Sequence, residues 1–208
     1  MKVLLVNGSP RAKGCTYTAL YEVAKELEKE NIETEILHVG SKPIRGCMAC
    51  GGCYGDNSGR CTFDDDIVNI ALEKAKTADG FIFGSPVHYA AASGQITSFL
   101  DRFFYAGDCF RYKPGAAIVS CRRGGATAAF EQLNKYFTIS NMPIVSSQYW
   151  NMVHGNTPEE VIQDLEGMQT MRVLGRNMAW LLKTIQAGRE AGVKLPEKEP
   201  RAVTNFIR

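Results

Sequence analysis

The sequence predicts an α/β fold in which a doubly wound parallel sheet carries helices on both faces. Three observations lead to this prediction. Short apolar runs alternate along the chain with segments whose apolar residues recur at the helical period. No internal repeat or low-complexity tract interrupts the alternation. Three of the segments that follow apolar runs are rich in Gly, Pro, hydroxyl or basic residues, as expected of binding loops at the carboxyl edge of such a sheet.

Five apolar runs are the predicted strands, and they cover residues 2–6, 33–39, 80–84, 116–120 and 143–146. The first predicted helix spans about residues 16–30. The apolar faces of four further helices are marked by Val68, Ala71, Leu72 and Ala75; by Ile96, Phe99, Leu100 and Phe103; by Phe130, Leu133 and Phe137; and by Met171, Leu174, Met178, Leu181, Leu182 and Ile185. Asp64, Asp65 and Asp66 are predicted to supply the N-cap and first-turn acids of the second helix.

The domain organisation follows from chain length and local composition. A chain of 208 residues is long enough for one sizeable core and short for two. We therefore predict one domain over residues 1–192, with a cysteine-rich loop at 46–61 inserted after the second strand. Residues 193–208 are rich in proline and charge, and we predict a loosely packed C-terminal arm there.

Composition narrows the class of protein. Apolar residues make up 45% and charged residues 22%, as in ordinary globular proteins. The net charge of +2 gives no reason to expect a nucleic acid or an anionic membrane as partner. No apolar run reaches the roughly 18 residues of a membrane span, and the N-terminal run is typical of a strand rather than a signal peptide. We predict a cytoplasmic protein, whose clustered cysteines indicate metal or redox chemistry rather than disulfides.

The first predicted binding loop joins the first strand to the first helix and reads NGSPRAKGCTYT. Free N–H groups and the dipole at a helix N-terminus favour a phosphate. Ser9, Thr16 and Thr18 can donate hydroxyls, and Arg11 adds positive charge. The loop lacks both the Walker A pattern and G-x-G-x-x-G, which favours one phosphate of a mononucleotide over a dinucleotide. The alternative is a plain strand–helix turn with surface charges.

The second predicted binding loop, GSPVHYAAASG at residues 84–94, follows the third strand. Pro86 restricts the backbone as it leaves the strand, and the small residues around it let a flat ring lie against the main chain. His88 and Tyr89 are candidates to line that ring. A lone histidine is more often structural, so we assign His88 no acid or base role.

The third predicted binding loop is SCRRGGAT at residues 120–127. Gly124 and Gly125 allow close backbone approach or positive φ. Arg122 and Arg123 can place positive charge beside a ring that becomes anionic when reduced; two solvated surface arginines are the alternative. A phosphate loop, a flat-ring loop and a basic glycine-rich loop at one sheet edge together suit flavin mononucleotide (FMN).

Four of the seven cysteines fall in one short stretch, at Cys47, Cys50, Cys53 and Cys61. Zinc sites usually use two separated C-x2-C pairs, whereas three cysteines spaced by two residues suit an iron–sulfur cubane better. The seven residues between Cys53 and Cys61 leave enough slack for Cys61 to return to the same cluster. We predict one 4Fe-4S cluster held by these four metal ligands. A zinc ion, or four thiols that only shape a loop, are the alternatives.

Several motifs resemble the flavodoxin-like NADPH-dependent FMN reductase superfamily. They are N-G-S-P-R-x-x-G at residues 7–14 ahead of a helix and S-P-V at 85–87 at the end of a strand. The C-x2-C-x2-C-x7-C loop ahead of three aspartates is similar to the iron–sulfur flavoprotein branch. The resemblance includes Gly-Met-Gln-Thr at 167–170 and leaves only the chain after about residue 192 uncovered. It implies a five-stranded sheet in the order 2-1-3-4-5.

The resemblance also implies positions for the cofactor. The phosphate of FMN would contact Ser9, Arg11, Cys15 and Thr16, and its ring would contact Pro86, Val87, His88, Tyr89, Ser120, Arg122, Arg123, Gly124 and Gly125. Members of the family often carry Asn or Ser where Cys15 stands, so the chain departs from the family pattern at this contact. The alternative interpretation of Cys15 is a thiol activated at the helix start. Related proteins usually form dimers or tetramers, which predicts a homodimer or homotetramer, with Tyr149 and Trp150 as candidate interface residues.

The predicted chemistry joins one-electron and two-electron carriers. In the cluster scheme, a ferredoxin-type donor delivers electrons through the cluster to FMN, and a small acceptor such as a quinone, O2 or peroxide receives them. Without a cluster, NAD(P)H would reduce FMN directly, and a quinone, a nitroaromatic or free flavin would be the acceptor. A flavodoxin-like electron carrier with no substrate of its own is the alternative from another class. None of these schemes demands a side-chain acid or base, so we name no catalytic residue.

Overall fold

The computed structural model describes residues 1–55, 59–200, 202–204 and 206, and these form one six-stranded sheet. Five strands run parallel in the order β2-β1-β3-β5-β6, and the sixth, β4 (Ala91–Ala92), pairs antiparallel with the end of β3. The parallel strands are β1 (Lys2–Asn7), β2 (Glu33–His38), β3 (Gly80–His88), β5 (Gly115–Cys121) and β6 (Met152–His154). Numbered consecutively, the parallel strands have the predicted order 2-1-3-4-5, and the doubly wound fold is confirmed.

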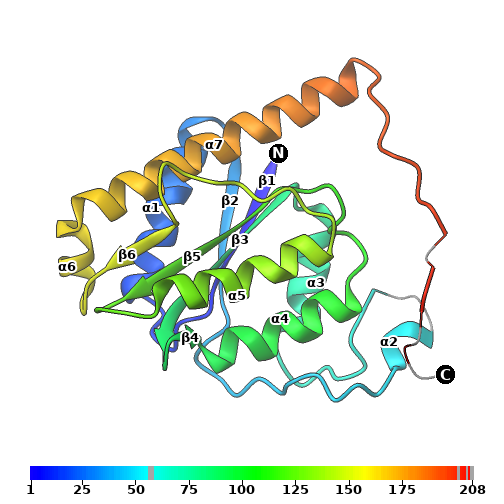
Figure 1. The fold of residues 1–208 in the computed structure, drawn as a ribbon, viewed down its shortest axis with the longest axis horizontal. Helices are drawn as coiled ribbons and strands as arrows, with labels where there is room; N and C mark the ends of the chain where they lie inside the picture. Colours follow the sequence, from blue (N-terminus) through cyan, green and yellow to red (C-terminus); the bar gives the residue numbers. More distant parts are fainter. Residues whose placement is uncertain (56–58, 201, 205, 207–208) are drawn as a thin grey trace.

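Helices cover both faces of this sheet (Figure 1). One face carries α1 (Cys15–Lys29), α6 (Pro158–Gln163) and α7 (Leu165–Glu190). The other carries α3 (Val68–Thr77), α4 (Gly94–Ala106) and α5 (Ala126–Ile139). The four-residue α2 (Gly52–Gly55) lies inside the cysteine-rich loop. Within the described ranges, no helix combines the length and the apolar character that crossing a membrane would require.

Side-chain alternation along each strand lets one sheet support two helical layers. In β1, Val3 and Leu5 pack in the core beneath α1 and α7, whereas Leu4 and Val6 pack in the core beneath α3, α4 and α5. All four side chains are fully buried. A parallel strand covered on both faces therefore appears in the sequence as an unbroken apolar run, which is why it could be recognised.

The fifth parallel strand is not where the sequence predicts it. Residues 143–146 contribute one isolated bridge, from Ile144 to Gly115, and the N–H group of Val145 donates to the carbonyl of Gly115. The chain then leaves the sheet and returns as β6, which pairs with the far end of β5. The sheet edge is therefore built in two pieces.

Polar residues between the two pieces explain the interruption. The hydroxyl of Ser147 donates to the carbonyl of Thr170 at 2.7 Å, and Asn177 donates to the carbonyl of Ser146 at 2.8 Å, so this segment bonds to α7 instead of β5. The buried Asn151 restores the pairing: its side chain donates to the carbonyl of Ala117 at 3.0 Å. The run of apolar residues at 143–145 was too short to reveal this return.

The start of α3 also differs from the prediction. The helix begins at Val68, and its first turn holds no acidic residue. Asp66 accepts a hydrogen bond from the N–H group of Val68 at 3.0 Å from outside the helix. Asp65 instead pairs with Arg45 at 3.0 Å, and Asp64 pairs with Arg60 of the cysteine-rich loop at 3.4 Å. The acidic run therefore anchors that loop rather than forming the first helical turn.

The C-terminal arm is described only in part. The described residues beyond α7, at 191–200, 202–204 and 206, form neither helix nor strand, and all of them are exposed. The remainder of the predicted arm at 193–208, namely residues 201, 205, 207 and 208, lies outside the described residues, as do residues 56–58 of the cysteine-rich loop. The division at residue 192 stays a prediction.

Ion pairs join α1 to α7 along the edge of their apolar contact. Glu26 is 4% exposed and pairs with Lys29 in its own helix and with Arg176 of α7 at 2.8 Å. Glu22 pairs in the same way with Lys25 and with Arg172. Burial alone would raise the pKa of Glu26, but its hydrogen bonds to Lys29 and Arg176 outweigh burial and hold that pKa below 4.5.

This lowered pKa predicts an acid-sensitive contribution to stability. Because the folded state holds the pKa of Glu26 below its unfolded value, the contribution is present above about pH 4.5 and is lost as the pH falls further. We expect Glu26→Gln to lower the free energy of unfolding by about 1–2 kcal/mol at about pH 7, with the difference shrinking toward about pH 3. Urea unfolding at the two pH values measures it.

The matched control is Glu30→Gln, which breaks the exposed pair between Glu30 and Lys183 on the same two helices. We expect this change to cost less than about 0.5 kcal/mol at either pH, because solvent screens an exposed pair. A Glu26 variant as stable as the wild type at about pH 7 would contradict the prediction.

Candidate functional site

The three predicted binding loops converge on one hollow at the carboxyl edge of the sheet. We call it the loop pocket; its volume is about 220 Å³. It is lined by Ser9, Pro10, Arg11, Cys15, Thr16, Pro86, Val87, His88, Ser120, Cys121, Arg122, Gly155 and Asn156. Each of the loops after β1, β3 and β5 contributes, which is the arrangement expected at the switch point of a doubly wound sheet.

One end of the loop pocket is suited to a phosphate group. Helix α1 begins there with Gly14 at its N-cap, and among the residues that the structure describes there is no side-chain cap on its first N–H groups. The first turn also holds no acidic residue, so the helix dipole is not neutralised. Arg11 lines the same end and adds positive charge. The residues present therefore fit the phosphate of a flavin mononucleotide.

A buried hydroxyl pair ties the first loop to the third. The Oγ1 atom of Thr16 lies 2.8 Å from the Oγ atom of Ser120, and both side chains are buried. The pair sits where the loops after β1 and β5 meet, and both residues line the loop pocket. This bond fixes the spacing of the two loops and uses one of the two hydroxyl donors, which leaves the other O–H group for a ligand such as a phosphate.

Five predicted cofactor residues do not line the loop pocket, namely Thr18, Tyr89, Arg123, Gly124 and Gly125. The hydroxyl of Thr18 donates to the carbonyl of Gly14 one turn earlier in α1. Tyr89 stands at the tip of the β3–β4 hairpin with a φ of 51° and a fully exposed side chain. Gly125 has a φ of 88°, and a Cβ atom there would lie 2.6 Å from the Cα atom of Ala90. This glycine lets the third loop pack against the second.

Four lining residues were not among the predicted contacts, namely Pro10, Cys121, Gly155 and Asn156. Gly155 and Asn156 follow β6, which the sequence did not reveal. The carbonyl of Gly155 accepts a hydrogen bond from the thiol of Cys15 at 3.7 Å. Burial raises the pKa of the Cys15 thiol, which favours a hydrogen-bonding thiol there over a reactive thiolate.

Gly40 lets the chain after β2 pass directly behind the phosphate end of the loop pocket. A Cβ atom at this position would lie 1.9 Å from the carbonyl oxygen of Ser9. Main-chain atoms cannot move aside as a flexible side chain can, so any side chain here must displace Ser9. The hydroxyl of Ser9 accepts a hydrogen bond from the N–H group of Arg11 at 3.2 Å, so Arg11 would shift with it.

This contact predicts a large effect of a small substitution. We expect Gly40→Ala to raise the dissociation constant of FMN at least about tenfold, a loss of about 1.4 kcal/mol. Quenching of flavin fluorescence by the apoprotein measures the constant. The control is Gly94→Ala, since a Cβ atom at Gly94 would meet nothing within 4 Å. Equal affinity of the Gly40 variant and the wild type would contradict the prediction.

A second hollow gathers the four clustered cysteines. We call it the cysteine pocket; its volume is about 140 Å³. It is lined by Cys47, Met48, Ala49, Cys50, Gly51, Cys53, Tyr54, Cys61, Thr62, Phe63, Arg102, Tyr105 and Ala106. The backbone between the first three cysteines is tightly wound, with positive φ values of 51° at Ala49 and 73° at Gly51. The structure thus brings all four predicted ligands around one space, although they span fifteen positions of the chain.

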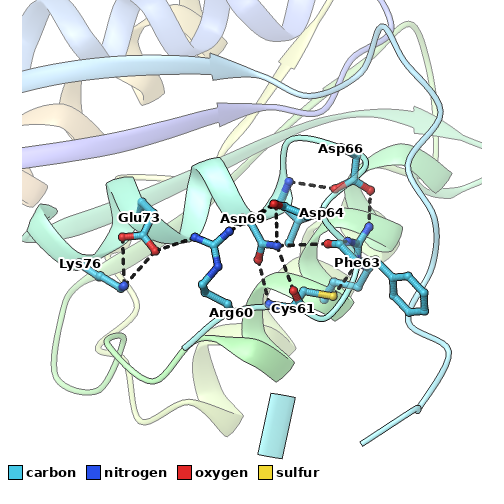
Figure 2. A network of polar contacts seen from close by, with 10 residues as sticks. Arg60, Cys61, Phe63, Asp64, Asp66, Asn69, Glu73 and Lys76 are labelled. Carbon is cyan, nitrogen blue, oxygen red and sulfur yellow. Dashed lines mark hydrogen bonds and ion pairs between the residues drawn. The ribbon is translucent and has the colours of Figure 1, made fainter. Parts of the chain in front are cut away.

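The fourth cysteine is held by a buried amide (Figure 2). The N–H group of Cys61 donates to Oδ1 of Asn69 at 2.8 Å, and Nδ2 of Asn69 donates back to the carbonyl of Cys61 at 2.9 Å. Nδ2 also contacts the carbonyl of Phe63 and the carboxylate of Asp64. Asn69 is 2% exposed and lies on α3, so the position of Cys61 depends on the packed core and not on its own loop.

The environments of the other cysteines differ from one another. A backbone hydrogen bond at Gly52, together with the hydroxyl of Thr62, lowers the pKa of Cys50, whereas burial raises the pKa of Cys53.

Among the described residues, no three His, Cys, Asp or Glu side chains are arranged to hold a single metal ion. In a cubane each thiolate binds a different iron, so the sulfur atoms surround the cluster instead of one point. A pocket lined by all four cysteines is compatible with that requirement.

The two pockets lie at opposite ends of α4. Ser93, at the N-cap of α4, donates its hydroxyl to the carbonyl of Gly8 in the first binding loop. Arg102, Tyr105 and Ala106, at the other end, line the cysteine pocket. A helix of 13 residues is about 20 Å long, so about that length of α4 lies between the cysteine pocket and the contact with the first binding loop.

Comparison with known proteins extends these observations. Residues 1–157 match the family described as NADPH-dependent FMN reductase. An iron–sulfur flavoprotein of Methanocaldococcus jannaschii is 33% identical over 195 residues, which cover 89% of this chain and 100% of that protein. An iron–sulfur flavoprotein of Archaeoglobus fulgidus is 32% identical over 177 residues, which cover 83% of this chain and 86% of that protein.

Two solved structures support the fold. RosB with the bound intermediate 8-demethyl-8-formylriboflavin-5′-phosphate superimposes with a TM-score of 0.69 at 18% identity, covering 100% of this chain and 94% of that chain. A flavodoxin from the Archaea gives a TM-score of 0.60 at 16% identity, covering 88% of this chain and 99% of that chain. These likenesses concern the flavodoxin-like fold alone, whereas the sequence matches reach the family. The chain therefore belongs to the NADPH-dependent FMN reductase family, within its iron–sulfur flavoprotein branch, and is a flavin-dependent oxidoreductase.

Proposed function

We propose that this FMN-dependent oxidoreductase holds a 4Fe-4S cluster on Cys47, Cys50, Cys53 and Cys61 and passes electrons between a one-electron donor and a small acceptor. The observation that carries the proposal is the convergence of these four cysteines on one pocket, separate from the loop pocket. Two relatives with substantial sequence identity are named iron–sulfur flavoproteins, which supports the same assignment. A ferredoxin-type protein is the proposed donor, and a quinone, O2 or peroxide is the proposed acceptor.

The chain's own residues have distinct tasks in this scheme. Bound FMN exchanges electrons singly or in pairs and a bound iron–sulfur cluster exchanges them singly, which is the chemistry these groups supply. At the loop pocket, Arg11 and the start of α1 would hold the phosphate, and Pro86 and Val87 would line the space for the flat ring. At the cysteine pocket, Asn69 fixes the backbone of Cys61, which lines the same pocket as the other three cysteines. No side chain in either pocket is required to transfer a proton.

A second candidate donor is NAD(P)H acting directly on FMN. The family description names NADPH, and this match covers the part of the chain that builds the loop pocket. In that case the cysteine pocket would be dispensable for turnover, and a quinone, a nitroaromatic or free flavin would accept the electrons. The two routes differ in whether removal of the cluster abolishes electron transfer from the donor.

The deciding experiment is purification without oxygen, followed by assays of FMN, iron, zinc and acid-labile sulfide on one sample. About four irons and four sulfides per chain beside one FMN would support the proposal. Zinc without sulfide, or FMN with no metal, would overturn it and favour the direct NAD(P)H route. Reduction of the flavin by NADPH and by reduced ferredoxin, followed separately at the flavin absorbance band, identifies the donor.

The proposal also covers the cellular location and the oligomeric state of the protein. A cytoplasmic location suits a chain whose seven cysteines are all free. We propose a homodimer or homotetramer, in which the half-exposed Tyr149 and Trp150 beside β6 lie at a subunit contact. Sedimentation equilibrium of the wild type and of Trp150→Ala tests this, and a monomeric wild type would overturn it.

A further inference from the structure

A buried guanidinium stands beside the cysteine pocket. Arg102 lies on α4 and is 1% exposed, and its Nε–H group donates to the sulfur of Cys61 at 3.3 Å. Its Nη1 group contacts the carboxylate of Asp66 and the carbonyl of Arg45, and its Nη2 group donates to the carbonyl of Phe63 at 2.9 Å. Four of the five N–H donors of the side chain are therefore engaged.

Such a charge needs a reason to be buried, because an enclosed ion is costly unless it is paired and fully hydrogen-bonded. Asp66 supplies one counter-charge, on the side of the guanidinium away from its Nε–H group. The Nε–H group points instead at a sulfur atom. A neutral thiol is a weak acceptor, whereas an ionised sulfur is a strong one. This bond is the kind expected for a sulfur that ligates iron, since metal ligands commonly accept such a hydrogen bond from a neighbouring side chain.

Cys61 differs from the other three cysteines in this respect. The thiol of Cys50 contacts the hydroxyl of Thr62, and that of Cys53 contacts the carbonyl of Tyr105, both at 3.9 Å. Within the part of the chain that the structure describes, Cys61 alone of the four accepts a hydrogen bond from a cationic side chain. Cys61 is also the cysteine that the sequence sets apart from the other three, by seven residues.

We propose that Arg102 is a positioning residue for the iron–sulfur cluster, which holds the Cys61 sulfur in place and raises the reduction potential of the cluster. The inference rests on the proposed function. A reduced cluster carries one more negative charge than an oxidised one, and a donor or a positive charge at a ligating sulfur stabilises that state. The rigid fork of Arg102, anchored to the acidic run and to the loop backbone, keeps the donor in place during both states.

The test compares reduction potentials of the intact protein, purified without oxygen and with FMN bound. Arg102→Gln removes the charge, and the double variant Arg102→Gln/Asp66→Asn removes it without leaving a buried carboxylate unpaired. We expect both to shift the cluster potential to more negative values in a titration followed by electron paramagnetic resonance. We also expect iron to be lost to a chelator several-fold faster. Arg102→Lys, which keeps the charge without the fork, should recover the potential more than the iron retention.

The matched control is Arg60→Gln, because Arg60 adjoins Cys61 in the chain but is 42% exposed and pairs with Asp64 and Glu73. We expect its potential and iron retention to equal those of the wild type. FMN content and circular dichroism report folding independently of the cluster.

Three outcomes would overturn the inference. Folded Arg102 variants with wild-type potential and iron retention would show that the arginine only joins α4 to the cysteine-rich loop. An equal shift in Arg60→Gln would show that bulk charge, and not the bond to Cys61, sets the potential. A wild-type protein with FMN and no iron would overturn the proposed function itself, a result distinct from unchanged variants.

Discussion

Replacing Cys50 with serine is expected to lower the iron content from about four atoms per chain to a small fraction of that, while FMN stays bound. Cys50 is one of the four thiols that line the cysteine pocket, and a serine hydroxyl is a poor ligand for a cluster that thiolates stabilise. The loop pocket lies at the other end of α4 and takes no lining residue from the cysteine-rich loop. Iron, sulfide and flavin assays on anaerobic protein measure the result.

The matched control for this prediction is Cys109→Ser. Cys109 is half-buried in the loop after α4 and does not line the cysteine pocket. We expect this variant to keep the iron and the FMN of the wild type. A Cys50 variant that retains its full iron content would refute the assignment of the four ligands, whatever its activity.

Replacing Thr16 with valine is expected to raise the dissociation constant of FMN about 10- to 100-fold, or about 1.4–2.8 kcal/mol. Valine keeps the shape of the side chain, which is 1% exposed, but removes the hydroxyl that pairs with Ser120 at 2.8 Å. The buried hydroxyl of Ser120 then loses its partner, and the phosphate end of the loop pocket loses a donor. Fluorescence titration of the apoprotein with FMN measures the change.

Thr18→Val is the control, because Thr18 lies half a turn further along the same helix and its hydroxyl bonds to the carbonyl of Gly14. We expect this variant to bind FMN with the wild-type constant. Equal losses in the two variants would mean that α1 as a whole, and not the hydroxyl of Thr16, supports the ligand. An unchanged constant in both would place the phosphate elsewhere.

Most of the fold could be predicted from the sequence. The runs at 2–6, 80–84 and 116–120 became β1, β3 and β5, because parallel strands covered on both faces need continuous apolar residues. The first helix was equally clear, since Leu20, Val23 and Leu27 repeat at the helical period and are fully buried. Buried positions that recur at a regular period produce an apolar pattern that can be recognised in a single sequence.

The helices and strands that were not predicted from the sequence lack such an apolar pattern. β6 has three residues and pairs only with the end of β5. α2 has four residues, none of them buried. α6 begins with Thr157 as its N-cap and Pro158 in its first turn, a start signal that could have been used, but only Val161 of its six residues is buried. Helices and strands that bury few side chains are determined more by the contacts around them than by the pattern of their own residues.

Some residues of the candidate site could be predicted from the sequence, and others could not. Loop chemistry pointed to residues such as Ser9, Thr16 and Pro86, which line the loop pocket, since glycine, proline and hydroxyls at strand ends have local causes. The lining by Gly155 and Asn156 could not be foreseen, because it depends on where β6 rejoins the sheet. Tyr89 was expected in the pocket and is exposed instead, since the hairpin of β3 and β4 turns it outward.

Sequence alone determined the doubly wound sheet, the positions of the three predicted binding loops and the spacing of the four cysteines, because each arises from periodicity or from residues close in the chain. Only the tertiary structure decided that Asn69 and Arg102, from two different helices, hold Cys61 at the cysteine pocket. A buried arginine in a helical pattern looks like a solvated charge until its partners are known. Those partners lie up to 57 positions away, and only chain packing brings them within hydrogen-bond distance.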